Sequence, residues 1–247
     1  MMFLKKYARR LILGPRADSE FFINFLRKKG AIIGEGTYFY DPRSNCIGLN
    51  NYFNLVIGNN VNITHGVVIV DHGYDWSVLK CKYGEVIGNT GQVTIGNNVF
   101  IGMNAVILKN VTIGDNVIIG AGSIVNRDIP SNSVAAGSPC RVIESIDTYR
   151  AKRKQVQLDE AYNLYCAFIN RYPNTIPNQD IFREYFWLFD RPGCDGHLSS
   201  PVFDEVMHLV NGTYDCSIQA IKNSSPAFDS YEDFLIYCSS RYFKYKR

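Results

Sequence analysis

The sequence lacks the features that mark several common classes of protein. No apolar run approaches the roughly 18 residues that a membrane-spanning helix needs. The net charge is only +3, from 26 basic and 23 acidic side chains, which is too mild to indicate a nucleic-acid partner. The seven cysteines form no CxxC pair and no cluster with histidine. We therefore expect reduced thiols in a cytoplasmic protein that holds no metal.

What is present is ordinary in amount and unusual in placement. The 247 residues are 46% hydrophobic and 20% charged, as in a globular protein, which excludes a disordered or fibrous chain. Most of the 20 glycines fall between Gly30 and Gly137, and many of them follow isoleucine. Aromatic residues, by contrast, gather toward the other end of the chain. Two kinds of sequence are therefore joined end to end.

The glycine-rich part has a period of six residues. Written in sixes from Ile95, it reads IGNNVF, IGMNAV, ILKNVT, IGDNVI, IGAGSI and VNRDIP. The first place is always Ile or Val, and the second is Gly in four of the six units. A stretch from Ile57 follows the same rule, and weaker single units begin at Ile33 and Ile47. This period is neither the 2 of an exposed strand nor the 3.6 of a helix.

A period of six predicts a solenoid with flat walls. Each unit makes one short strand and one turn, with its first-place aliphatic side chain pointing inward. Gly or Asn allows the positive φ that a corner needs. Three units close one triangular coil, and successive coils stack in parallel at roughly 4.8 Å, so that each satisfies the backbone hydrogen bonds of the next.

The stretch IGNNVFIGMNAVILKNVTIGDNVIIGAGSIVNRDIPSNSVAAGSPCRVI resembles the hexapeptide-repeat acyltransferases, above all their sugar O-acetyltransferase branch of maltose and galactoside acetyltransferase-like enzymes. The resemblance is close over about residues 57–144, thin over 30–56 and slight elsewhere. It implies a left-handed parallel β-helix and a homotrimer. It also implies active sites between neighbouring subunits and acetyl-CoA as co-substrate. None of these four points follows from the spacing alone.

We divide the chain into three parts. Residues 1–29 are predicted to form amphipathic helices broken at Gly14-Pro15, with Asp18 or Ser19 as an N-cap. Residues 30–145 form the β-helix with a protruding loop at 71–92. Residues 146–247 form a helical extension, with helices expected at 148–172, 178–189, 201–210, 217–222 and 231–242.

The roles of the two ends stay open. The basic helices of residues 2–29 either cap the open end of the solenoid or lie peripherally on the inner face of a membrane. The aromatic extension either adds a wall for a bulky saccharide acceptor or packs on its own trimer.

The repeat is interrupted at residues 71–92, where its register breaks. A solenoid tolerates such an insertion as a loop, and loops on a rigid scaffold often carry chemistry. Acyl transfer to a hydroxyl needs a base, and histidine suits that task near neutral pH. His72 opens the loop, and the resemblance places it on the catalytic histidine of the family. Asp71 and Asp75 are near carboxylates that can orient it, and the sequence does not choose between them.

Four further residues are candidates for contacts with the acceptor. Tyr74 and Trp76 can stack on a sugar ring or pack the loop against a neighbouring subunit. His65 lies at an outward position inside a repeat, where it either contacts a ligand or is simply solvated. Asn54 resembles an acceptor-contacting asparagine of the family.

The resemblance also places the coenzyme in a groove beside the last coils. The matching positions are Gly102, Met103, Ala121, Gly122, Asn126, Arg127 and Arg141. Small residues let backbone amides approach the pantetheine chain, and guanidinium groups suit its phosphates. The alternative is that the glycines serve only corners and the arginines are solvated. Phe100 departs from the tryptophan that the family often has, and it lacks an indole N–H.

These observations favour an acetyl-CoA-dependent O-acetyltransferase acting on a sugar hydroxyl, as in a capsule or O-antigen polysaccharide. An N-acetyltransferase for an amino sugar and a non-catalytic scaffold are the alternatives. The γ-class carbonic anhydrases share this solenoid, but their zinc site needs three histidines. Only four histidines are present, and none lies between residues 73 and 196.

Overall fold

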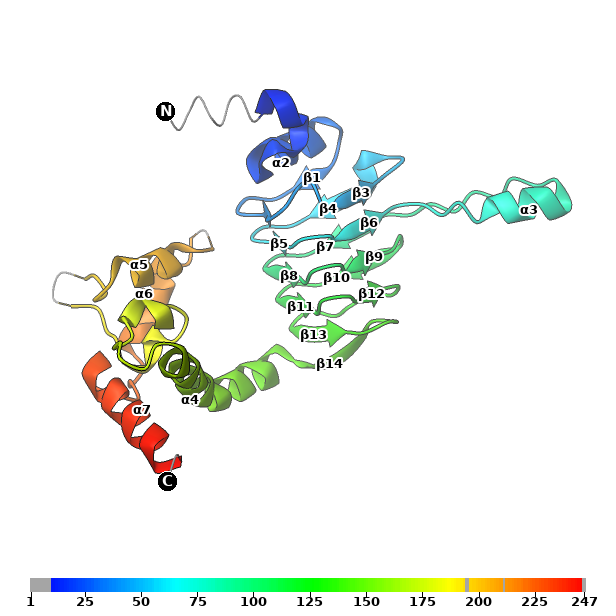
Figure 1. The fold of residues 1–247 in the computed structure, drawn as a ribbon. Helices are drawn as coiled ribbons and strands as arrows, with labels where there is room; N and C mark the ends of the chain where they lie inside the picture. Colours follow the sequence, from blue (N-terminus) through cyan, green and yellow to red (C-terminus); the bar gives the residue numbers. More distant parts are fainter. Residues whose placement is uncertain (1–9, 194–195, 211, 246–247) are drawn as a thin grey trace. The chain divides into compact units, whose positions relative to one another are not determined.

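The computed structural model describes residues 10–193, 196–210 and 212–245. Two compact units make up the chain, Met1–Tyr149 and Arg150–Arg247. The first is built on parallel strands and the second on helices (Figure 1). Each unit has its own hydrophobic core.

Three sheets form the walls of the first unit. Sheet A has the strand order β1-β4-β7-β10, sheet B the order β14-β13-β11-β8-β5-β2, and sheet C the order β12-β9-β6-β3. All neighbours pair in parallel except β13 and β14, which are antiparallel. The strands are β1 (Ile32–Ile33), β2 (Tyr38–Phe39), β3 (Cys46–Gly48), β4 (Leu55–Ile57), β5 (Asn62–Ile63), β6 (Val68–Val70), β7 (Val93–Ile95), β8 (Val99–Ile101), β9 (Val106–Ile107), β10 (Val111–Ile113), β11 (Val117–Ile119), β12 (Ile124–Val125), β13 (Ser133–Ala136) and β14 (Arg141–Ser145).

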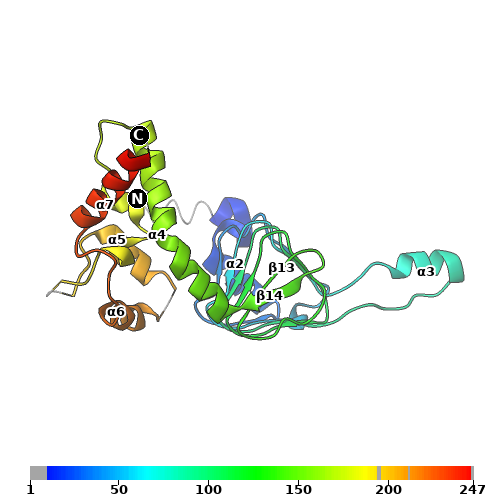
Figure 2. The ribbon, with the colours of Figure 1, turned by 90° about the horizontal axis from the view of Figure 1, so that it is seen from below.

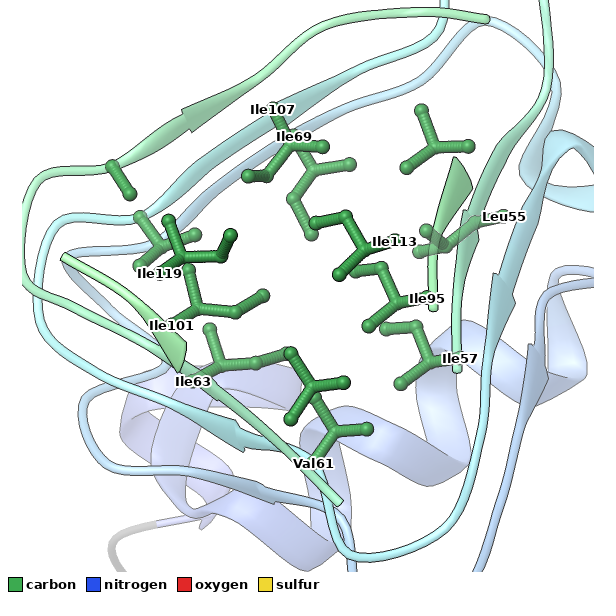
Figure 3. Packing of buried hydrophobic residues seen from close by; sticks show 14 of the residues in the cluster. Leu55, Ile57, Val61, Ile63, Ile69, Ile95, Ile101, Ile107, Ile113 and Ile119 are labelled. Carbon is green, nitrogen blue, oxygen red and sulfur yellow. The ribbon is translucent and has the colours of Figure 1, made fainter. Parts of the chain in front are cut away.

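The first-place aliphatic residues stack in three columns inside the coils, as the six-residue period predicts (Figure 3). In sheet A, Ile57 pairs with Ile95 and Ile95 with Ile113. Sheet B aligns Ile63, Ile101 and Ile119 in the same way, and sheet C aligns Ile69, Ile107 and Val125. All nine side chains are buried. Such parallel sheets fit a left-handed β-helix.

Asparagine and glycine both supply the positive φ that the corners need, as the sequence predicts. The left-handed conformation is adopted by asparagines at residues 60, 98, 104, 110, 116 and 132 and by glycines at 36, 66 and 122. The second-place glycine Gly96 does not need positive φ. A Cβ there would lie 2.5 Å from Asp115 Oδ1 and 2.8 Å from the backbone of Gly114 on the next coil. That glycine therefore allows close stacking of the coils.

Helix α2 (Ser19–Lys28) covers one end of the β-helix. Asp18 is its N-cap and accepts a hydrogen bond from the Phe21 N–H at 2.9 Å, after a 3₁₀ turn η1 at Gly14–Ala17. Phe22 and Leu26 of this helix are buried in the same core as the first coil. The apolar face of α2 therefore packs on the solenoid, as the capping interpretation expects. Residues 2–9 of the basic segment lie outside the described residues.

The interruption of the repeat is an arm that leaves one corner of the stacked coils (Figures 1 and 2). Its two segments run antiparallel at the base, where Gly73 N–H donates to Asn89 O and Gly91 N–H donates to Asp71 O, both at 2.8 Å. The arm carries a helix at its tip, α3 (Trp76–Tyr83), none of whose residues is buried. The sequence indicated a loop here but not this helix.

The second unit packs helices around aromatic side chains. Its elements are α4 (Ile146–Arg171), which begins in the first unit, η3 (Gln179–Phe182), η4 (Phe186–Leu188), α5 (Pro201–His208), α6 (Tyr214–Lys222) and α7 (Tyr231–Tyr245). The helix predicted at 178–189 is wrong, because two short 3₁₀ turns replace it. Phe186 and Phe203 stack at 5.0 Å between ring centroids, and both are buried.

Among the described helices, none has the length and apolar character needed to cross a membrane.

Candidate active site

The candidate site lies where sheet C ends and the arm begins. Strand β6 ends at Val70, and the next two residues are Asp71 and His72. We name the corners by the sheets they join, so this one is the C–A corner. Asp71 is fully buried, while the imidazole of His72 is 22% exposed. The end of strand β6 thus holds a fully buried carboxylate against a partly exposed imidazole.

Four donors converge on the Asp71 carboxylate. Oδ1 accepts from the Asn50 backbone N–H at 2.9 Å and contacts His72 Nδ1 at 2.8 Å. Oδ2 accepts from the Asn51 backbone N–H and from Asn54 Nδ2, both at 3.0 Å. Burial by itself raises the pKa of this carboxyl, but the hydrogen bonds outweigh burial and hold the pKa below its ordinary value. Asp71 is therefore ionised at neutral pH.

This ionised partner fixes the tautomer of His72. A carboxylate can only accept, so the proton between the two groups belongs to Nδ1 of the imidazole. In the neutral ring the lone pair then lies on Nε2, which points away from Asp71. A buried carboxylate behind a histidine also stabilises the imidazolium that forms when Nε2 takes a proton. The pair is built to accept a proton at one defined atom.

The geometry decides which of the two candidate carboxylates, Asp71 or Asp75, orients His72. Asp75 does not contact His72; both of its oxygens accept from Asn89 Nδ2, at 2.8 and 2.9 Å, across the base of the arm. These hydrogen bonds, with a smaller effect of the Lys109 charge, hold the pKa of Asp75 below its ordinary value. Asp71 is the carboxylate against the imidazole, and Asp75 ties the arm together.

The aromatic candidates lie on the arm just beyond His72. The rings of Tyr74 and Trp76 pack on each other with centroids 4.9 Å apart, and the Tyr74 side chain is 69% exposed. These two rings therefore form an aromatic surface on the arm. Asn54 also lies at the site, but its amide faces Asp71 and positions that carboxylate.

His65 belongs to a different corner, the one that joins sheets B and C. Its Nδ1 lies 3.0 Å from Asp41 Oδ2, and its side chain is 53% exposed. Within one chain His65 and His72 lie at opposite edges of sheet C, so the structure does not bring them together.

The residues suggested for the coenzyme also divide between these two corners. Gly102, Met103, Ala121 and Gly122 lie at the B–C corner, where Gly122 N–H donates to Met103 O at 2.8 Å. Asn126 and Arg127 directly follow β12, so they lie at the C–A corner two coils from His72. Arg141 is on β14 and donates from Nη1 to the Cys140 carbonyl at 2.6 Å.

Sequence reasoning missed three groups at or near the site. Lys109 lies at the C–A corner, on the coil between His72 and Arg127, and the repeat register alone could have found it. Lys109 and Arg127 stand 18 residues apart, which is one full coil. The donors from Asn50 and Asn51 are backbone N–H groups, which any residue type supplies, so no sequence signal marks them.

Two cations bear on whether the C–A corner suits the phosphates of a coenzyme. Lys109 and Arg127 are cations on successive coils of that corner, and Arg127 is exposed without an ion-pair partner among the residues that the structure describes.

Phe100, where the family often has tryptophan, lies on the outer face of sheet B between Asn62 and Ile118, with 43% of its surface exposed.

Comparison with known proteins gives the same assignment for the repeat. Residues 92–127 match the family described as bacterial transferase hexapeptide (six repeats). Protein CapG of Staphylococcus aureus is 44% identical over 127 residues, covering 51% of this chain and 73% of CapG. Galactoside O-acetyltransferase of Escherichia coli K12 is 43% identical over 140 residues, covering 50% of this chain and 68% of that protein.

Among solved structures, a maltose O-acetyltransferase from Clostridium difficile 630 is 34% identical, with a TM-score of 0.36, and the match covers 51% of this chain and 75% of that one. Within the described residues, no group of three histidine, cysteine or acidic side chains is placed to hold a metal ion. The extent and identity of the CapG and galactoside O-acetyltransferase matches settle the family. The chain belongs to the hexapeptide-repeat transferases, as its sequence resemblance implies, and is an acyltransferase.

Proposed function

We propose that the protein transfers an acetyl group from acetyl-CoA to a hydroxyl of a sugar, as part of a surface polysaccharide such as a capsule or O-antigen. The observation that carries this proposal is the His72–Asp71 pair, whose buried carboxylate leaves Nε2 of His72 as the proton acceptor. The relative named as a galactoside O-acetyltransferase supports a saccharide acceptor.

The pair supports a direct transfer. His72 Nε2 removes the proton of the attacking hydroxyl as its oxygen bonds to the acetyl carbonyl carbon. The C–S bond of the thioester then breaks, and the imidazolium returns the proton to the departing thiolate. Asp71 stays ionised and stabilises the imidazolium between these two steps. Acetyl-CoA supplies the activated acyl group, and the products are the sugar ester and CoA.

The division of the candidate coenzyme residues between two corners supports a site shared by subunits of a homotrimer. In one chain, Met103 and Gly122 lie across the width of sheet C from His72. A neighbouring copy that presents its B–C corner to the His72 corner would bring the two sets together. Lys109 and Arg127 then provide cations for the phosphates of CoA on the His72 side.

Release of the CoA thiol in the presence of candidate acceptors tests the proposal. The wild-type protein is expected to turn over with a hydroxyl sugar, and His72→Ala to lose about 10²- to 10⁴-fold of that activity. Unchanged turnover in folded His72→Ala would remove this histidine from the mechanism.

The same assay decides which atom is acylated. A sugar with a free hydroxyl and its amino counterpart are supplied separately, and the products are identified by mass spectrometry. Product on nitrogen alone would replace the O-transferase by an N-transferase on the same fold. Mass spectrometry of surface glycans from cells with and without the protein then identifies the natural acceptor. The proposal places the enzyme in the cytoplasm, and fractionation of such cells tests that location.

A further inference from the structure

The second unit carries an open pocket that the proposed acetyl transfer does not use. It lies along helix α5 and has a volume of about 840 Å³. Its polar lining includes Asp204, Glu205 and His208, and its apolar lining includes Pro201 and Leu209. The pocket therefore combines hydrogen-bonding groups with apolar surface, which is the usual character of a site for a small organic ligand.

Asp204 supplies a charged acceptor to the pocket. Its side chain is 21% exposed, and Oδ2 lies 3.5 Å from His197 Nδ1. Oδ1 is shielded from the pocket. Oδ2 is therefore the oxygen of this carboxylate that a ligand with a hydrogen-bond donor can approach.

The charge of the pocket restricts the ligand further. Asp204 and the exposed Glu205 are both acidic, and no lysine or arginine occurs among the described residues that line the pocket. An anionic ligand, including a phosphate or CoA, is repelled by such a surface. The ligand is therefore neutral or positively charged and rich in donors.

One ring of the pocket lining is held in place. The imidazole of His208 stacks on the ring of Tyr214, with centroids 4.1 Å apart and planes within 6° of parallel. Leu209, next to His208, is 57% exposed, and Pro201 is exposed at the other end of α5. Flat apolar surfaces cover the C–H faces of a sugar ring, while neighbouring acceptors bind its hydroxyls.

We propose that this pocket binds one sugar residue, neutral or amino-substituted, of a saccharide chain. A metal ion is a weaker interpretation, because no three ligating side chains converge within the described residues. The proposal concerns binding alone and does not depend on acetyl transfer at His72. It assigns a carbohydrate-recognition role to a unit whose sequence shows no repeat.

Histidine resonances offer a direct test, because the four histidines divide evenly between the units. His197 and His208 lie at the pocket, whereas His65 and His72 belong to the β-helix. The full chain, labelled on histidine, is titrated at constant pH and without acetyl-CoA. The probes are galactose, glucosamine and glucuronic acid, with a lysine-rich peptide as a fourth. Single His→Gln variants assign the four signals.

Galactose or glucosamine is expected to shift the His197 and His208 signals with saturation, and glucuronic acid is expected to leave them unchanged. Asp204→Asn is expected to weaken this binding at least about tenfold, because a hydrogen bond to a charged group is lost. Asp229→Asn, an exposed aspartate of the same unit outside the pocket, is the control and is expected to bind like wild type.

Three results would overturn the proposal: no shift of the pocket histidines with any sugar, a shift with the peptide alone, or equal affinity in Asp204→Asn and wild type. A shift confined to His72 would locate the sugar at the transfer site and would also refute the pocket. Since none of these readouts requires turnover, they are independent of the fate of the proposed acetyl transfer.

Discussion

The hydrophobic cores of the two units are packed in opposite ways. In the first unit each coil repeats the contacts of the one before, so that Ile63, Ile101 and Ile119 form one column of sheet B. In the second unit Phe186 stacks on Phe203, and Phe189 stacks on Phe234, which joins side chains from separate segments without any repeat. A periodic core can be recognised from its spacing, whereas a core of unlike contacts cannot.

The same difference determines how the candidate site of each unit can be found. In the β-helix the candidate pair occurs where the repeat stops, at the end of strand β6. Asp71 and His72 directly follow strand β6, whose hydrogen bonds to the neighbouring coils hold them in place. In the second unit no period exists to be broken, and the pocket at Asp204 is found only from the folded structure.

Loss of the Asp71 charge is expected to have the largest effect. Asp71→Asn removes the carboxylate that fixes the His72 tautomer, and activity is expected to fall about 10²- to 10⁴-fold. Asp75→Asn is the matched control, because the Asp75 side chain accepts from Asn89 across the base of the arm rather than from His72. Initial rates of thiol release measure both variants. Similar losses in the two would show that arm geometry, rather than the pair, limits the reaction.

Truncation of one core at a time tests whether the units unfold separately. Ile101→Ala in the β-helix is expected to cost about 2–5 kcal/mol and Phe203→Ala in the second unit about 3–5 kcal/mol, since both side chains are fully buried. Trp187 reports on the second unit when Trp76 is replaced by Phe. In that background, thermal unfolding followed by fluorescence should shift with Phe203→Ala and little with Ile101→Ala. Equal shifts would mean that the units unfold together.

Glycine substitutions test whether Gly96 is needed for close stacking of the coils. Gly96→Ala is expected to destabilise the β-helix by about 1–3 kcal/mol, because its new methyl group would meet the next coil. Gly88→Ala lies in the arm, where no atom is within 4 Å of the added carbon, and is expected to be nearly neutral. Denaturant unfolding followed by circular dichroism measures both. A neutral Gly96→Ala would show that the coils have room to separate.

The sequence predicts the β-helix and its core because one rule fixes three columns of side chains and their register. It also indicates where the rule fails, so His72 and Asp71 are both candidates from the sequence alone. The choice of Asp71 over Asp75 is beyond the sequence, since it depends on backbone N–H groups of Asn50 and Asn51. The helix predicted at 178–189 is wrong because the apolar spacing there serves two 3₁₀ turns packed into an aromatic core.

The smallest expected effect is on the pH dependence of stability, which compares a buried carboxylate of the β-helix with an exposed one of the second unit. Asp71 has a folded-state pKa below its ordinary value, so its contribution to stability is complete above the unfolded-state pKa and is lost as pH falls through the folded one. Unfolding free energy of the β-helix is therefore expected to fall less steeply below about pH 4 in Asp71→Asn than in wild type.

Glu160 is the control from the second unit. Its pKa is also lowered, by a hydrogen bond from Arg153, but this pair is solvent-exposed. Because water and salt screen exposed pairs, Glu160→Gln is expected to change the acid slope very little. Unfolding followed by circular dichroism between about pH 2 and 6 compares the variants across the range where carboxyl groups titrate. Equal slopes in Asp71→Asn and wild type would contradict the lowered pKa. A four-donor buried carboxylate and a surface ion pair would then contribute alike to stability, and burial of Asp71 could not be the feature that distinguishes the candidate corner from the rest of the molecule.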